Sequence, residues 1–211
     1  MYGRLLFAVA GLMLLLTHPF TGSAAAATVK PLEVFSEKIL VLEIEYLAAE
    51  HTLSSVLLRK SVDSLNKGMN IMSKETARDS LKLLTNVSES LAAAQKSSAA
   101  LSSYLTVNSS RLKEAGHGRF LPLAEMDSEI ETSYYKALAV FIETAYGFVQ
   151  YCSDNFEAIS SGSKEEGKLY DELYAGYIKE MERFNVQSMN RSQLLAEMGS
   201  EYPSLWELMP R

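Results

Sequence analysis

The chain has 211 residues, 47% of them hydrophobic, and a formal net charge of −6 at pH 7. This acidic balance argues against a nucleic-acid partner, because binding to phosphates needs a basic face. The single cysteine, Cys152, excludes an intramolecular disulfide, so the folded chain must be held together by its apolar core.

The first 27 residues have the three parts of a cleavable signal peptide. Arg4 precedes an unbroken apolar run from Leu5 to Leu16, and small residues follow from Ser23 to Ala27. The run fits the 7–15 residues or so of a signal peptide and is shorter than the roughly 20 residues of a membrane anchor. We expect cleavage near Ala27 and a periplasmic or secreted mature protein. No later apolar run predicts a membrane span.

The first predicted helix extends from Pro31 to about Lys67 and carries two apolar lines. The first line, with spacings of three and four, is Phe35, Ile39, Leu42, Tyr46, Ala49, Leu53 and Val56. The second line is Leu40, Ile44, Leu47, Leu58, Val62 and Leu65. Because one line is enough to pack a helix on one neighbour, two lines predict contact with two neighbours.

The second predicted helix begins near Ser73, a good N-cap, and its apolar stripe continues to Leu112. We expect a loop over residues 116–123, because Gly116, Gly118 and Pro122 occur there. The third predicted helix covers about 124–159, with Tyr134, Leu138, Phe141, Ala145, Phe148 and Cys152 on one stripe.

The fourth predicted helix covers about 164–198, and Gly199 is its expected C-terminal cap. Its stripe is Tyr170, Tyr174, Tyr177, Met181 and Phe184. The predicted organisation is therefore a signal peptide (1–27), a helical domain (28–199) and a C-terminal tail (200–211).

Four long helices joined by short loops predict an all-α fold. The arrangement they favour is an antiparallel up-down-up-down four-helix bundle with long, coiled-coil-like helices. Two alternatives also fit the pattern: a pair of long hairpins in looser contact, and a dimer that shares the first hairpin.

Signatures of catalysis are missing from the sequence. The mature part has two histidines, His51 and His117, too few for the Glu-x-x-His pairs of a di-iron bundle. No serine lies in a nucleophile elbow, and the stripe position of Cys152 predicts a buried, unreactive thiol. We therefore predict a protein that is not an enzyme and has no cofactor.

Protein binding, as an adaptor or as a homodimer, is the leading functional hypothesis. Its candidate partner-binding residues are a basic cluster and the only tryptophan: Arg111, Lys113, Arg119 and Trp206. A carrier or sensor of a small apolar or aromatic ligand is the alternative, with a site between the third and fourth helices. Its candidate residues are Tyr134, Phe141, Phe148, Tyr170, Tyr174 and Tyr177. A haem- or metal-binding bundle is the second alternative.

Overall fold

A computed structural model describes residues 31–118 and 120–201, and all structural statements concern these residues. The predicted signal peptide, Arg119 and Trp206 lie outside them. The chain divides into two units, Met1–Phe35 and Ser36–Arg211, and the packing described below belongs to the second.

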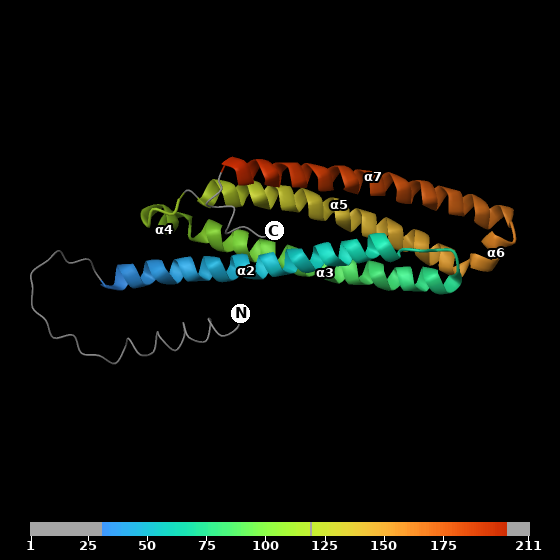
Figure 1. The fold of residues 1–211 in the computed structure, drawn as a ribbon, viewed down its shortest axis with the longest axis horizontal. Coiled ribbons are helices and arrows are strands. Elements are labelled where there is room, and N and C mark those ends of the chain that lie inside the picture. The colour runs from blue at the N-terminus through green and yellow to red at the C-terminus, as the bar shows by residue number, and fades with distance from the viewer. Residues whose placement is uncertain (1–30, 119, 202–211) are drawn as a thin grey trace, which may run out of the picture. The chain divides into compact units, whose positions relative to one another are not determined.

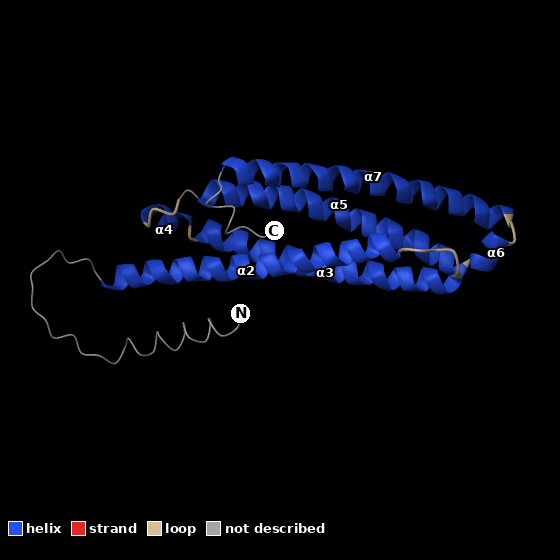
Figure 2. Cartoon of the chain, viewed as in Figure 1, coloured by secondary structure: helices blue, strands red, loops and turns tan. Residues whose placement is uncertain are grey.

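The described residues form six helices and no strand (Figures 1 and 2). Four helices are long: α2 (Pro31–Gly68), α3 (Lys74–Val107), α5 (Phe120–Asp154) and α7 (Lys164–Glu201). The short helices α4 (Ser109–Glu114) and α6 (Phe156–Ser160) follow α3 and α5. The predicted all-α fold is confirmed.

Asparagines end two of the long helices earlier than predicted. The side chain of Asn108 donates to the Tyr104 carbonyl (2.9 Å), and that of Asn155 donates to the Tyr151 carbonyl (3.1 Å). A short amide side chain competes in this way with the helical backbone for a carbonyl. The stripes that looked continuous in the sequence are therefore divided into α3 with α4 and α5 with α6.

The sequence pattern predicted that Pro122 lies in a loop and that Gly199 ends a helix, and both predictions are wrong. Pro122 lies in the first turn of α5, not in a loop. The first backbone N–H groups of a helix have no partner within it, so proline is tolerated there. Gly199 lies inside α7, which continues to Glu201 instead of ending at a glycine cap.

Helices α2 and α3 form an antiparallel pair. A hydrogen bond of 3.2 Å joins the His51 ring to the Ser97 hydroxyl, and one of 2.8 Å joins the Ser61 and Ser90 hydroxyls. Residue numbers rise on α2 as they fall on α3. Ser80, fully buried on α3, closes this hairpin through hydrogen bonds with both the N–H and the C=O of Asn70 (2.8 Å each).

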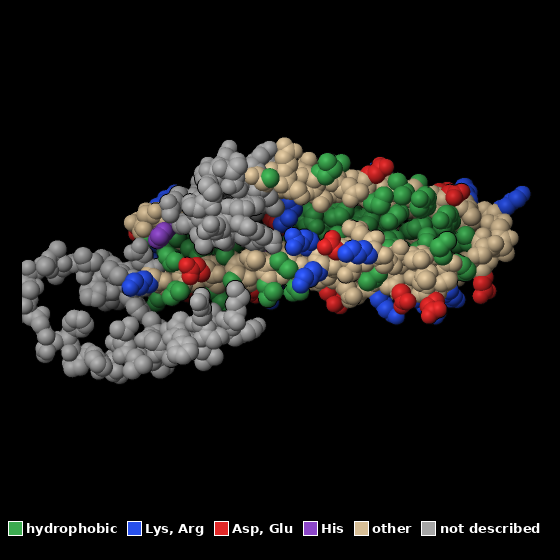
Figure 3. Space-filling view, viewed as in Figure 1, with side chains coloured by type: hydrophobic (Ala, Val, Ile, Leu, Met, Phe, Trp, Pro, Cys, Tyr) green, Lys and Arg blue, Asp and Glu red, His purple; other side chains and the backbone are tan. Residues whose placement is uncertain are grey.

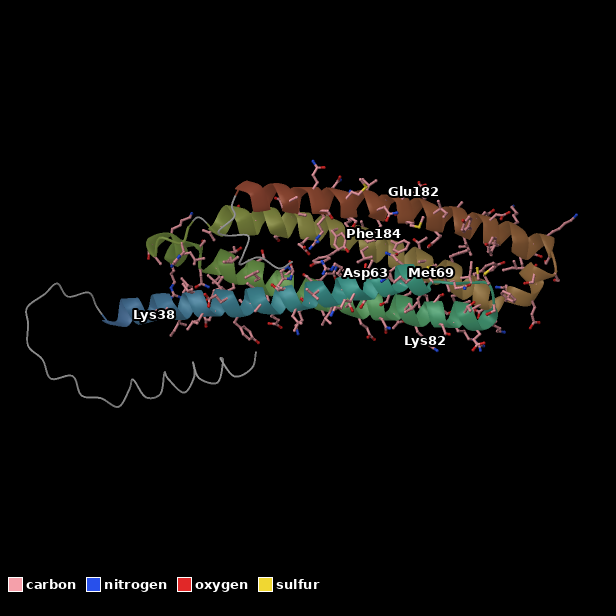
Figure 4. The ribbon with its side chains drawn as sticks, viewed as in Figure 1. Lys38, Asp63, Met69, Lys82, Glu182 and Phe184 are labelled. Carbon is pink, nitrogen blue, oxygen red and sulfur yellow. The ribbon has the colours of Figure 1, made fainter. Side chains whose placement is uncertain are left out.

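Helices α5 and α7 lie side by side and are also antiparallel (Figure 1). Glu131 is paired with Arg191 near the beginning of α5, and Phe148 contacts Tyr170 near its end. Phe184 lies on the side of α7 that faces α5 (Figure 4) and stacks on Phe141 with ring centroids 5.6 Å apart.

Burial separates the two apolar lines of α2. Leu40, Leu58 and Leu65 of the second line, which we call the inner line, are buried, at 2% exposure or less. In the first line, which we call the outer line, Leu42 is 56% exposed and Leu53 is 61% exposed. Within the described part of the chain, the outer line does not meet a second neighbour as the sequence led us to expect.

The main core cluster contains residues from all four long helices, including Leu58, Leu84, Phe148 and Phe184. None of the described helices combines the length and the apolar content that crossing a membrane requires.

The hydrogen bonds of Ser80 predict that Ser80→Ala destabilises the protein by about 0.5–1.5 kcal/mol, because the N–H and C=O of Asn70 lose the Ser80 hydroxyl as their partner. Ser88→Ala, at an exposed position of the same helix, is the matched control and should change the free energy of unfolding by less than about 0.5 kcal/mol. Urea unfolding of both variants measures the difference. Equal effects would show that Ser80 does not hold the hairpin closed.

Candidate functional site

A group of polar side chains interrupts the apolar interior at one level of the four long helices. We call it the polar core cluster. It consists of His51, Ser54 and Ser55 on α2, Ser97 on α3, Glu131 and Tyr135 on α5, and Arg191 on α7.

The α2 and α3 side of the cluster is a short chain of hydrogen bonds. His51 is 1% exposed, and its Nδ1 atom lies 3.2 Å from the Ser97 hydroxyl oxygen. That oxygen lies 2.5 Å from the hydroxyl oxygen of Ser54. The hydroxyl–imidazole pair resembles the first two members of a nucleophilic triad. Both groups, however, lie in the packed interior, where a substrate could reach them only by displacing a helix.

The α5 and α7 side of the cluster is a buried ion pair. The Glu131 side chain is 1% exposed and that of Arg191 is 24% exposed. The Arg191 Nε atom donates to Glu131 Oε1 (2.8 Å), and Arg191 Nη2 donates to the same oxygen. The guanidinium also lies 5.0 Å from the centroid of the Tyr134 ring, a cation–π contact. One aromatic and one carboxylate thus hold the Arg191 side chain.

Four buried polar atoms of the cluster form no hydrogen bond of good geometry among the described residues, although the Tyr135 hydroxyl lies close enough to Glu131 and Ser55 to interact with both. They are His51 Nε2, Ser55 Oγ, Glu131 Oε2 and the Tyr135 hydroxyl oxygen. A buried polar group without a partner costs about 1–3 kcal/mol, so such atoms are usually served by ordered water or a small polar ligand. Polar atoms of two helices, α2 and α5, are therefore able to form hydrogen bonds with a water molecule or a small polar ligand in this cluster.

Burial and neighbouring charges shift the protonation of the cluster. Desolvation lowers the pKa of His51, the Glu131 carboxylate opposes this shift, and the Arg191 guanidinium adds to it. Burial raises the pKa of Tyr135, and the nearby Glu131 carboxylate raises it further. Neutral imidazole and neutral phenol are thus the favoured forms.

The sequence contains a signal for this cluster, in the form of polar residues at apolar stripe positions. Glu131 lies three residues before Tyr134 and so continues the α5 stripe, and Arg191 lies seven residues after Phe184 on the α7 stripe. His51 and Ser54 fill the gap in the inner line of α2 between Leu47 and Leu58. A polar residue in an apolar register predicts a buried polar group, and here four helices carry one at the same level.

The six aromatic residues proposed as a ligand site are brought together between α5 and α7. The Phe148 ring lies 5.4–5.6 Å, between centroids, from three tyrosine rings, and the Phe141 and Tyr134 rings pack on the chain of rings through Phe184. The six residues are Tyr134, Phe141, Phe148, Tyr170, Tyr174 and Tyr177. Hydrophobic side chains gather between α7 and the α2–α3 hairpin over this region (Figure 3). The rings fill the seam by packing on one another, and ligand binding there stays a prediction.

The basic cluster proposed as a partner site is only partly described. Arg111 and Lys113 are exposed on the short helix α4, and Arg111 donates to the Asn108 side chain (3.2 Å). Arg119 and Trp206 lie outside the described residues. Their role in partner binding also stays a prediction.

Cys152 and a surface groove lie outside the clusters described above. Cys152 is 3% exposed, as its stripe position predicted, and burial raises the pKa of its thiol to about 11. An open groove of about 410 Å³ lies between α2 and α3. Its wall consists of Ile39, Leu42, Glu43, Tyr46 and Leu47 of α2 and Tyr104 of α3. All of the α2 residues except Glu43 belong to the two apolar lines.

Comparison of the chain with known protein families, with curated proteins and with solved structures finds no match.

The buried ion pair predicts that Arg191→Met destabilises the protein by about 3 kcal/mol, because the Glu131 carboxylate is left buried without its counter-charge. The double variant Glu131→Leu/Arg191→Met removes both charges and should recover to within about 1 kcal/mol of the original stability. Urea unfolding of the two variants measures this. A double variant as unstable as the single variant would rule out the stranded charge as the cause.

The lowered pKa of His51 predicts a pH-dependent stability. The unfolded chain, with a His51 pKa near 6.5, binds a proton at a higher pH than the folded chain. Stability is therefore fully present above about pH 6.5 and falls as the pH drops toward the folded pKa, by at most about 1.4 kcal/mol per pH unit. Thermal unfolding between about pH 5 and 8 should show a flatter profile for His51→Gln than for the matched control His117→Gln. Parallel profiles would contradict the assignment.

Proposed function

We propose that this chain is a non-enzymatic protein-binding module, exported to the periplasm or the cell exterior by the leader in residues 1–27. Its binding surface is the outer line of α2, which we place on an up-down-up-down four-helix bundle. The proposal makes no use of a cofactor.

The bundle topology is supported by the two antiparallel pairs. Helices α2 and α3 run in opposite directions, as do α5 and α7, and α3 packs extensively on α5. A core cluster with members on all four helices fits a single bundle better than two separate hairpins, because it removes apolar surface of both pairs from water.

One observation carries the functional proposal: the outer line of α2 is apolar and exposed. Ile39, Leu42, Tyr46 and Leu53 recur at helical spacing and are 38–61% exposed. Leu57 extends the line at 49% exposure. Single exposed apolar residues are ordinary, but a contiguous row of them usually marks an interaction site.

The chemistry of the surface indicates the kind of partner. A row with spacings of three and four matches the apolar face of a partner helix, which would lie along the groove between α2 and α3. Tyr46 and Tyr104 at that groove suit the centre of an interface, since their rings give large contact area. The Tyr104 hydroxyl donates to the Glu43 carboxylate at the wall of the groove.

A photo-crosslinking residue at position 46 tests the proposal. We expect light-dependent adducts with a protein in the exported fraction, and we expect Leu42→Gln/Leu53→Gln in the same chain to abolish them without a change in the thermal unfolding temperature. The same crosslinker at exposed Ser88 of α3 is the control and should give no adduct. Absence of a protein adduct at position 46 would overturn the proposal, whereas an adduct with any protein, including another copy of this chain, supports it.

A further inference from the structure

Charged residues border the outer line of α2 in an uneven order. Glu43 and Glu45 lie in its first half, and Arg59 and Lys60 lie at its end. All four side chains are exposed, and within the described residues neither basic residue forms an ion pair. The outer line therefore has an acidic first half and a basic end. It lies on the part of α2 between Lys38 and Asp63, which Figure 4 labels.

The spacing of the line assigns each of these residues a place in a helix–helix contact. Ile39, Leu42, Tyr46, Ala49 and Leu53 take the alternating a and d positions of a heptad pattern. Glu45 and Arg59 then both occupy g positions, two heptads apart, and Glu50 occupies an e position. In antiparallel helix pairs, g residues of one helix face g residues of the other.

We propose that the outer line of α2 binds a second copy of this chain, with the two α2 helices antiparallel and Glu45 of each copy facing Arg59 of the other. This inference rests on the proposed protein-binding function and names its partner. The contact is isologous, since the same surface of each copy meets itself across a twofold axis.

The apolar residues fit the same register. Tyr46 lies opposite Val56 of the second copy, and Ala49 lies opposite Leu53. The small Ala49 near the centre allows the helices to approach closely. Lys60 lies opposite Leu42, where its aliphatic stem covers the leucine while its ammonium reaches the acidic pair Glu43 and Glu45.

Two competing arrangements bring more like charges together than the proposed register, in which only the two Glu50 side chains meet. A shift by one heptad toward the N-terminus of α2 pairs Lys38 with Arg59 of the second copy and Glu43 with Glu50. A parallel pair in register places Glu45 beside Glu50 of the second copy. Because like charges at such positions oppose association, the antiparallel register with Glu45 facing Arg59 is favoured over these two arrangements.

The hairpin leaves room for this second helix beside α2. Tyr104 borders the groove, and Ala100, four residues before it, shares its face of α3. Ala93 lies seven residues earlier, and both alanines are exposed. Small side chains there let a helix lie in the groove with about 27 Å of α2, from Ile39 to Leu57, in contact.

A charge-reversal cycle in the exported chain tests the proposal by sedimentation equilibrium. Glu45→Arg and Arg59→Glu each turn two attractions into two repulsions and should weaken dimerisation roughly tenfold or more. The double variant Glu45→Arg/Arg59→Glu should restore the original dissociation constant to within about threefold. Glu50→Gln should tighten the dimer a few-fold, since the two Glu50 side chains meet at the twofold axis in this register.

Two exposed charges elsewhere give the matched controls, Lys82→Glu on α3 and Glu182→Arg on α7 (Figure 4). Both controls should leave the dissociation constant unchanged, and circular dichroism should show an unchanged helix content in every variant. A monomer at all concentrations, or a dimer that the cycle does not weaken and restore, would overturn the inference. A crosslink from position 46 to a different protein would then still support the proposed function, so that the two failures are distinguishable.

Discussion

The ion pair between Glu131 and Arg191 is the constraint on which the arrangement of α5 and α7 depends. A carboxylate that is 1% exposed requires a counter-charge, and Arg191 of α7 supplies it from 60 residues further along the chain. This requirement favours one register of the two helices. The same register brings Phe184 to Phe141 and Tyr177 to Phe148, so the polar contact and the aromatic seam are satisfied together.

The interior is thereby divided into two chemically different regions. Between the second half of α5 and the first half of α7, aromatic rings such as Phe148 and Tyr177 pack against one another. These contacts are insensitive to pH in the neutral range. At the level of His51 and Glu131, the core instead contains polar atoms of which four form no hydrogen bond of good geometry among the described residues. The first region removes aromatic rings from water, whereas the second makes stability depend on the protonation of His51 and penalises any shift of the helices along one another.

The sequence predicted the helices well and their roles less well. The stripes of α5 and α7 have the spacing of buried faces, and Leu138, Phe148 and Cys152 are indeed buried. On α2 the same spacing occurs twice, and periodicity cannot say which line faces the core. The inner line is interrupted by His51 and Ser54 and looks the poorer candidate, yet it is buried because those polar groups find Ser97 across the hairpin.

The sequence by itself determined the fold class, the long helices, the burial of Cys152 and the lack of common catalytic patterns, because each depends on local spacing and residue type. Only the tertiary structure decided which apolar line stays exposed, that Glu131 meets Arg191, and that Asn108 and Asn155 end helices. Those outcomes depend on partners at least 40 residues away for the packing contacts, and on a local competition for carbonyl groups at the asparagines.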